Sequence, residues 1–173
     1  DAFATLNVVD LLVDDDLTVA GDVAVTGDYS STTSGTSNLR LGVNAGNSIA
    51  SGGNYNVVVG DEAGTAITTG DSNVLIGHTA GDAINTGGYN VGIGDRALTN
   101  TTTANGNVAV GADSLFTNIL AAKNVALGSD ALKTLNTGTA TDTFNTAVGH
   151  AAGVAVTTGI KNTIIGGLAG DAI

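Results

Sequence analysis

Several residue types that stabilise ordinary globular domains are missing from this chain of 173 residues. It contains no cysteine, proline, methionine or tryptophan, and aromatic side chains make up only 3% of it. The lack of cysteine excludes disulfides. Because aromatics are so few, any core must be built from Val, Ile, Leu and Ala. Such side chains suit narrow, regular coils better than an irregular globule.

Positive charge is also scarce. Five cations stand against 16 acidic residues, so the formal net charge is −11. There is no basic stripe, which excludes nucleic-acid binding, and the acidity disfavours docking on an anionic membrane. No apolar run approaches membrane-spanning length, so we expect no membrane insertion. Glu62 is the only glutamate, and a composition rich in aspartate favours corners and strands over helices.

What the chain has in abundance is a repeat. An asparagine, an apolar-rich triplet and a glycine recur in steps of 18, 17, 17, 17, 17, 21 and 17 residues. The asparagines are Asn38, Asn56, Asn73, Asn90, Asn107, Asn124, Asn145 and Asn162. A fixed period of this size is typical of a solenoid, in which each repeat is one coil stacked on the last. The sequence therefore predicts an all-β, parallel β-solenoid or β-roll with coils of about 17 residues.

The apolar triplet predicts a short strand. Its first and third positions share one face and are mostly β-branched, as a buried pleated surface prefers. The middle position faces the other way and is also apolar or small in seven of eight repeats. Its residues are Arg40, Val58, Leu75, Gly92, Ala109, Ala126, Ala147 and Ile164. A single coil hides only its inside, so we expect the strand row to pack against other copies, as an intertwined or side-by-side homotrimer.

The glycines and asparagines of the repeat each predict a structural role. A corner with φ > 0 explains the glycine that ends every triplet, namely Gly42, Gly60, Gly77, Gly94, Gly111, Gly128, Gly149 and Gly166. The asparagines either form a hydrogen-bonded ladder between coils or cap their own turns, and both roles stay open. A short helical turn at Ala97-Leu98 also stays open. The extra residues 139–142 are expected to bulge out as a loop without breaking the stack.

Two regions follow from these patterns. Residues 1–37 are expected to form an N-terminal strand/turn segment and linker, with a doubled strand-plus-turn unit over Leu17–Asp28. Residues 38–173 are expected to form a solenoid of eight repeats. Because the chain starts at Asp1 without methionine and stops mid-pattern at Ile173, we expect a fragment or a processed product.

Candidate chemical sites are few. His78 and His150 share a repeat position but lie about four rungs, or ~19 Å, apart, too far to share a metal ion within one chain. The alternative is that three symmetry copies of either histidine surround an ion on a trimer axis, but the other residues of this position are typical of a surface. The run Asp14-Asp15-Asp16 offers calcium ligands, yet the Gly-Gly-x-Gly-x-Asp repeat of calcium-binding β-rolls is absent. Acidic residues recur along one edge: Asp61, Glu62, Asp95, Asp113 and Asp130. They occupy separate repeats with no cleft for a sugar, so we expect no catalytic residue, metal or cofactor.

Tyr55 and Tyr89 both precede a repeat asparagine and are expected to lie in one column, two rungs apart. Exposed tyrosines at such positions bind glycans or protein partners, whereas the alternative is ordinary packing at the edge of the coil.

The repeats resemble two families of cell-binding fibres. Residues 145–153, closed by the turn Thr157-Thr158-Gly159, resemble shaft repeats of phage tail fibres, of the kind that precede intramolecular chaperone domains. The Asn-x-Ala-Val-Gly core is also similar to head repeats of trimeric autotransporter adhesins, which form a trimeric left-handed parallel β-roll. The resemblance implies a homotrimer, an extracellular location and attachment to a host glycan or protein through another part of the fibre.

The leading hypothesis is therefore the structural shaft of a phage tail fibre or spike. The alternative is a trimeric adhesin or filament on a bacterial surface, and the last is a polysaccharide-cleaving solenoid enzyme.

Overall fold

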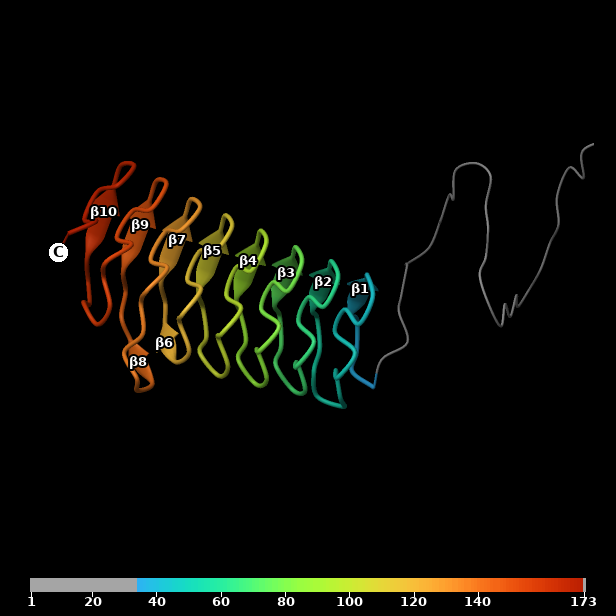
Figure 1. The fold of residues 1–173 in the computed structure, drawn as a ribbon. Coiled ribbons are helices and arrows are strands. Elements are labelled where there is room, and N and C mark those ends of the chain that lie inside the picture. The colour runs from blue at the N-terminus through green and yellow to red at the C-terminus, as the bar shows by residue number, and fades with distance from the viewer. Residues whose placement is uncertain (1–33, 173) are drawn as a thin grey trace, which may run out of the picture.

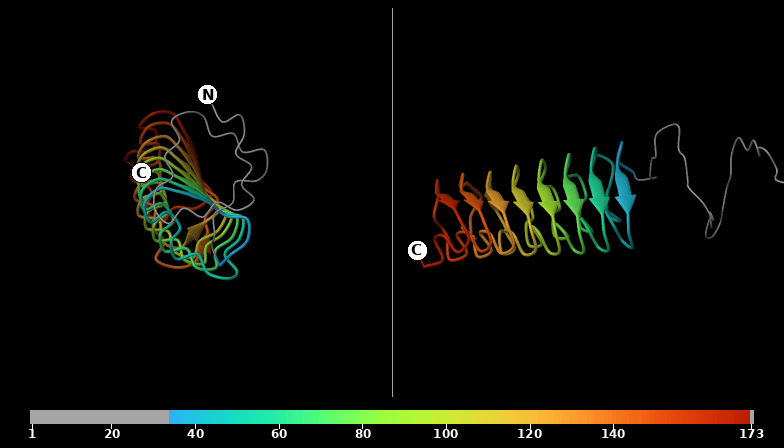
Figure 2. Two further views of the ribbon diagram at one scale, coloured as in Figure 1. Left: turned by 90° about the vertical axis from the view of Figure 1, so that its right-hand side faces the viewer. Right: turned by 90° about the horizontal axis from the view of Figure 1, so that it is seen from above.

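The computed structural model describes residues 34–172, which form a parallel β-solenoid of about seven turns. The expectations for Asp14–Asp16 and for Leu17–Asp28 lie outside the described residues. Successive coils stack along one axis, and equivalent strands form a row along the rod (Figures 1 and 2). No helix occurs within residues 34–172, and Ala97-Leu98 belongs to a turn. The predicted all-β parallel solenoid is confirmed.

One eight-stranded parallel sheet runs the length of the rod. Its strands in order are β1 (Leu39–Leu41), β2 (Val57–Val59), β3 (Val74–Ile76), β4 (Val91–Ile93), β5 (Val108–Val110), β7 (Val125–Leu127), β9 (Thr146–Val148) and β10 (Thr163–Ile165). Every pair is in register from repeat to repeat, as in Val91 opposite Val108. A second, two-stranded sheet joins β6 (Ala121–Ala122) to β8 (Thr141–Asp142).

The extra residues of the longest repeat leave the stack intact. β7 pairs with β9 in the usual register, with Val125 opposite Thr146. Residues 138–140 are exposed, as a bulging loop requires. Thr141 and Asp142, in contrast, form β8 and pair with β6 of the preceding coil. The insertion is therefore part loop and part strand.

The two faces of the main sheet differ from expectation. The middle residue of each strand points into the coil, and Val58, Leu75 and Ala109 are fully buried. The first and third residues point outward, and their predicted burial is wrong for the single chain: they are half-buried or exposed, up to 70% at Ile165. The repeat asparagine is itself buried, and it stands two residues before the middle residue of the strand, as Asn56 before Val58. Because residues two apart share a face, the middle residue also points into the coil.

Left-handed corners define the shape of each coil. The glycine after each strand has φ between 124° and 137°. At Gly60, an added Cβ would also lie 2.5 Å from the carbonyl oxygen of Gly77 in the next coil. Glycine is therefore required here both by the backbone conformation and by the close stacking of coils.

The core is filled in two alternative ways. In the coil of β2, Val58 fills the centre, and a Cβ added at Gly64 would lie 2.7 Å from its Cγ1. In the coil of β5 the strand residue is only Ala109, and Leu115, at the position equivalent to Gly64, fills the space instead. The same exchange pairs Leu75 with Gly81, Gly92 with Leu98, and Ala126 with Leu132. The coils of β2 to β7 thus keep a similar core volume with different residues. The coil of β9 has Ala147 and Gly153 instead, and Leu132 and Ile164 of the adjacent coils reach this space, 3.0 Å from a Cβ added at Gly153.

The first coil is an exception. Its inward strand position holds Arg40, whose Nε donates a hydrogen bond to the carbonyl oxygen of Ala45 at 2.6 Å. The side chain is half-buried, so it covers the apolar core at this end of the described solenoid.

Candidate functional site

The repeat asparagines form a continuous ladder inside the coils. Each Oδ1 accepts a hydrogen bond from the backbone N–H of the next asparagine, over distances of 2.8–3.0 Å. In most coils the Nδ2 group also donates to a carbonyl of its own coil, as from Asn56 to Gly70 at 2.9 Å. The ladder is therefore confirmed, whereas most of these amide bonds reach a carbonyl 14 residues ahead, almost a full coil away, and do not cap a local turn. Seven successive bonds between coils make the stack stiff along its axis.

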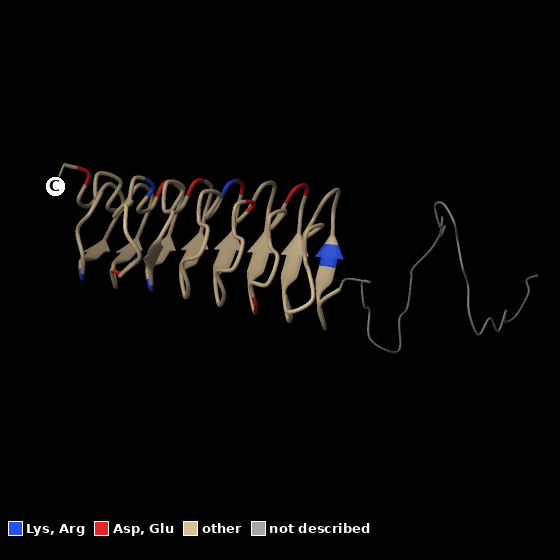
Figure 3. Ribbon diagram, turned by 90° about the horizontal axis from the view of Figure 1, so that it is seen from below, with Lys and Arg blue, Asp and Glu red and all other residues tan. Residues whose placement is uncertain are grey.

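The outward face of the main sheet is a largely apolar stripe. Fourteen of its 16 positions are Val, Ile or Leu, and the other two are Thr146 and Thr163. Leu41, Ile76 and Leu127 are 43%, 37% and 37% exposed. Charged residues lie at the corners, and the only charged side chain in this sheet is Arg40 in β1 (Figure 3). An exposed apolar surface this regular indicates a contact surface.

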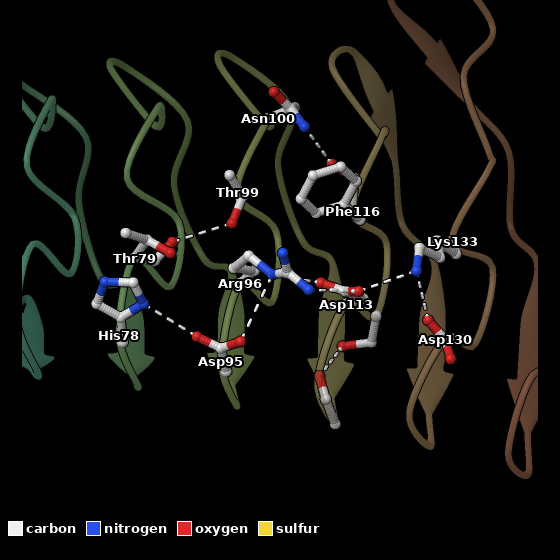
Figure 4. Close-up of polar contacts among 12 residues, drawn as sticks. His78, Thr79, Asp95, Arg96, Thr99, Asn100, Asp113, Phe116, Asp130 and Lys133 are labelled. Carbon is white, nitrogen blue, oxygen red and sulfur yellow. Dashed lines mark hydrogen bonds and ion pairs between the residues drawn. The ribbon is translucent and has the colours of Figure 1, made fainter.

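The acidic residues of one edge alternate with cations. Arg96 Nε lies 2.8 Å from Asp113 Oδ1, and Lys133 Nζ lies 2.9 Å from Asp113 Oδ2 (Figure 4). His78 Nδ1 lies 3.0 Å from Asp95 Oδ1, and Lys133 also bonds Asp130 at 2.8 Å. The hydrogen bonds that Lys133 Nζ donates to Asp130 and then to Asp113 raise the pKa of Lys133. These carboxylates are held as acceptors in ion pairs, an arrangement typical of a structural network.

Among residues 34–172 no group of three metal-ligating side chains comes together. His150 is exposed and lies four coils from His78. Asp61 and Glu62 are exposed at the edge of the coil of β2.

Tyr55 and Tyr89 lie in one column, as their sequence positions indicate, and they are 64% and 71% exposed. Sequence reasoning missed a third member of the column, Phe144, which is 48% exposed. The signal was present, because Phe144 directly precedes Asn145 as each tyrosine precedes its own asparagine.

Comparison with family models, with curated proteins and with solved structures finds no match for this chain. Over the residues that the structure describes, no helix is both long and apolar enough to span a bilayer. Inferences about function therefore depend on the geometry of the rod itself.

Proposed function

We propose that this chain is a structural shaft segment of an extracellular host-attachment fibre, as in a phage tail fibre, and that it functions as a homotrimer. Its role is mechanical, because a stiff spacer holds a receptor-binding part, located elsewhere in the fibre, at a fixed distance from the virion. The observation that supports this most strongly is the apolar stripe along the outward face of the main sheet.

Stiffness follows from the contacts between coils. Each junction combines three in-register strand residues, one asparagine bond and a close approach between glycine corners, as at Gly60 and Gly77. Bending the rod would lengthen these bonds on one side and compress the glycine contact on the other. From first to last strand the described stack is roughly 34 Å long, at ~4.8 Å per rung.

The apolar stripe alone is too small for a stable interface between two chains. It is roughly 34 Å long and about 10 Å wide, so its footprint of about 340 Å² is well below the ~800 Å² per partner of a stable pairwise interface. In a threefold bundle each chain contacts two neighbours and can also use the flanks of its stripe. The two outward columns, for example Val108 and Val110 in β5, then each face a different neighbour.

A bacterial surface adhesin is the second candidate, since the same rod would serve it. The exposed column of Tyr55 and Tyr89 favours this alternative, because an adhesin of this shape presents its side for binding. A sugar-cleaving enzyme has the least support, because the candidate carboxylates Asp95 and Asp113 are engaged with cations.

Light scattering tests the proposal directly. We expect a molar mass of about three times the 16.8 kDa of one chain. Val110→Lys places a charge in the stripe and should reduce the mass to that of one chain while the far-UV circular dichroism stays unchanged. Ala112→Lys, at an exposed corner of the same coil, is the matched control and should stay trimeric. A wild-type protein that is monomeric at high concentration would refute the bundle.

A further inference from the structure

Exposed aromatic side chains gather at one corner of the solenoid. Tyr55, Tyr89 and Phe144 each directly precede a ladder asparagine, and they are three of the four aromatic residues within residues 34–172. All three are largely exposed, and neither tyrosine hydroxyl hydrogen-bonds another described residue. Core packing therefore does not account for their presence.

The backbone holds these rings in a strained and fixed position. Tyr55, Tyr89 and Phe144 have φ of 59°, 59° and 52°, which is unfavourable for bulky residues. Gly106 occupies the same position in another coil with φ of 68°, so a relaxed alternative exists. The N–H groups of Tyr55 and Tyr89 donate to the carbonyls of Thr36 and Asp71 at 3.0 and 2.9 Å, which anchors the corner to the preceding coil. Ser72, Lys123 and Lys161, at the same position of other coils, have φ of 59°, 62° and 58°. This conformation therefore belongs to the corner of every coil, and for the aromatic residues it fixes where the rings lie.

The spacing of the tyrosines leaves their ring faces open. They belong to coils two rungs apart, about 9.6 Å at ~4.8 Å per rung. Adjacent rungs would bring two rings to the ~5 Å at which aromatics stack on each other. The intervening position holds the small Ser72, so each ring keeps a free face for a ligand.

A polar recess lies on the same edge, farther along the rod. A Cβ at Gly106 would meet only the Lys123 side chain, at 3.8 Å, so the column is open here. Beside it lies a cavity of about 400 Å³ whose lining includes Asn105, Thr141 and Asp142. At its far side Lys123 Nζ lies 5.3 Å from the centre of the Phe144 ring and 2.6 Å from Asp142 Oδ2.

This combination of side chains fits an uncharged sugar chain. Aromatic faces stack against the C–H faces of sugar rings, while Asn, Thr and Asp side chains hydrogen-bond hydroxyl groups. The formal net charge of −11 repels polyanions, and the cation nearest the recess, Lys123, is neutralised by Asp142.

We propose that this corner is a binding edge for a neutral polysaccharide that lies along the solenoid axis, with Tyr55, Tyr89 and Phe144 as stacking platforms and the recess at Asn105 between them. The site uses none of the outward strand residues of the main sheet and no receptor-binding part elsewhere in the fibre. It does not require the homotrimer, so the two proposals fail independently.

Native electrophoresis through gels that contain a polysaccharide tests the edge. The probes are hydroxyethylcellulose, galactomannan and dextran as neutral chains, and alginate as an anionic one. We expect retardation by at least one neutral chain and none by alginate. Tyr55→Ala/Tyr89→Ala should weaken binding about tenfold, from the stacking lost at two rings. Tyr55→Phe/Tyr89→Phe retains the rings and should bind like wild type, as should Ser72→Ala from the same column.

Three results would overturn the proposal. The first is the absence of retardation by all three neutral chains, and the second is unchanged retardation of the double alanine variant. The third is a lower molar mass of the double alanine variant by light scattering, which would assign the aromatic column to an interface between copies of the chain.

Discussion

Replacing Asn107 by alanine removes one rung of the asparagine ladder in the middle of the rod. Asn107 Oδ1 accepts hydrogen bonds from the backbone N–H and the Nδ2 of Asn124, at 3.0 and 3.1 Å. Its own Nδ2 donates to the carbonyl of Ala121 at 3.0 Å. The backbone N–H of residue 107 keeps its bond to Asn90 in the variant, because that bond does not use the side chain. The backbone N–H of Asn124, in contrast, is left buried without an acceptor.

The expected loss can be estimated group by group. An orphaned buried N–H costs about 1–3 kcal/mol. The other two groups lose less, because Ala121 O still accepts from Asn118 and Asn124 Nδ2 still donates to Ala122 O. The small cavity left by the amide adds about 1 kcal/mol. We therefore expect Asn107→Ala to lower the free energy of unfolding by roughly 2–4 kcal/mol, a large share of the stability of an ordinary domain.

Urea unfolding followed by far-UV circular dichroism measures this loss. All variants must be compared at one protein concentration, because self-association would add to the stability. Asn47→Ala is the matched control, since Asn47 is exposed and its side chain hydrogen-bonds, among the described residues, only the neighbouring Ser48 at 3.4 Å. Its change should stay within about 0.5 kcal/mol. Amide hydrogen exchange gives a local readout, in which the Asn124 N–H should lose protection. The reasoning is refuted if Asn107→Ala unfolds like the control or if the Asn124 amide stays protected.

Three further changes test the corners, the core and a half-buried carboxyl group, each by the same urea assay. Gly111→Ala combines φ of 130° with a Cβ only 2.6 Å from Gly128 O, so it should lower the free energy of unfolding by roughly 3 kcal/mol or more. The control Gly138→Ala, whose Cβ would have no atom within 4 Å, should lower it by about 1–2 kcal/mol, and equal losses would contradict the stacking argument. Leu75→Ala should leave a cavity and Gly81→Leu should clash with Leu75, so each single variant should lower the free energy of unfolding. The double variant should lose at least about 1 kcal/mol less than the sum of the two single losses, and strict additivity would refute the exchange of core volume. Burial raises the pKa of Asp82, whose Oδ1 has no partner, so the ionised carboxylate destabilises the folded state. Asp82→Asn should therefore stabilise the protein at pH 7, with a gain that vanishes as the pH falls below 3.8, and a gain that does not change with pH would contradict this cause.

The sequence predicted those features of the fold that follow from the period alone. A step of 17 residues between Asn90 and Asn107 puts equivalent side chains over one another, and the strand register of Val91 and Val108 follows from it. The alanine that recurs three residues after the corner glycine, such as Ala63, is fully buried at the same place in successive coils. These features need only the repetition itself, because any regular stack brings like residues together.

The direction of each strand face could not be predicted in this way. Alternation states that Val57 and Val59 share a face, but it does not state which face is inside. Burial of the asparagine ladder decides that question, and the ladder was only one of two interpretations of Asn56. Leu98, Leu115 and Leu132 were also unexpected, with φ of 58°, 51° and 49°. The left-handed conformation costs a leucine about 1–2 kcal/mol, and full burial of the side chain offsets that cost.

The inward positions of the rod vary, whereas the outward strand positions hardly do. Inside, Gly92, Ala109 and Leu75 occupy one column, because a neighbouring residue can compensate for any change in volume. Outside, a single chain imposes no such packing requirement, and water tolerates polar residues there at no cost. Fourteen apolar residues in 16 outward positions therefore need a constraint that the isolated coil does not supply. The proposed homotrimer would supply it, because another copy of the same rod has the matching period.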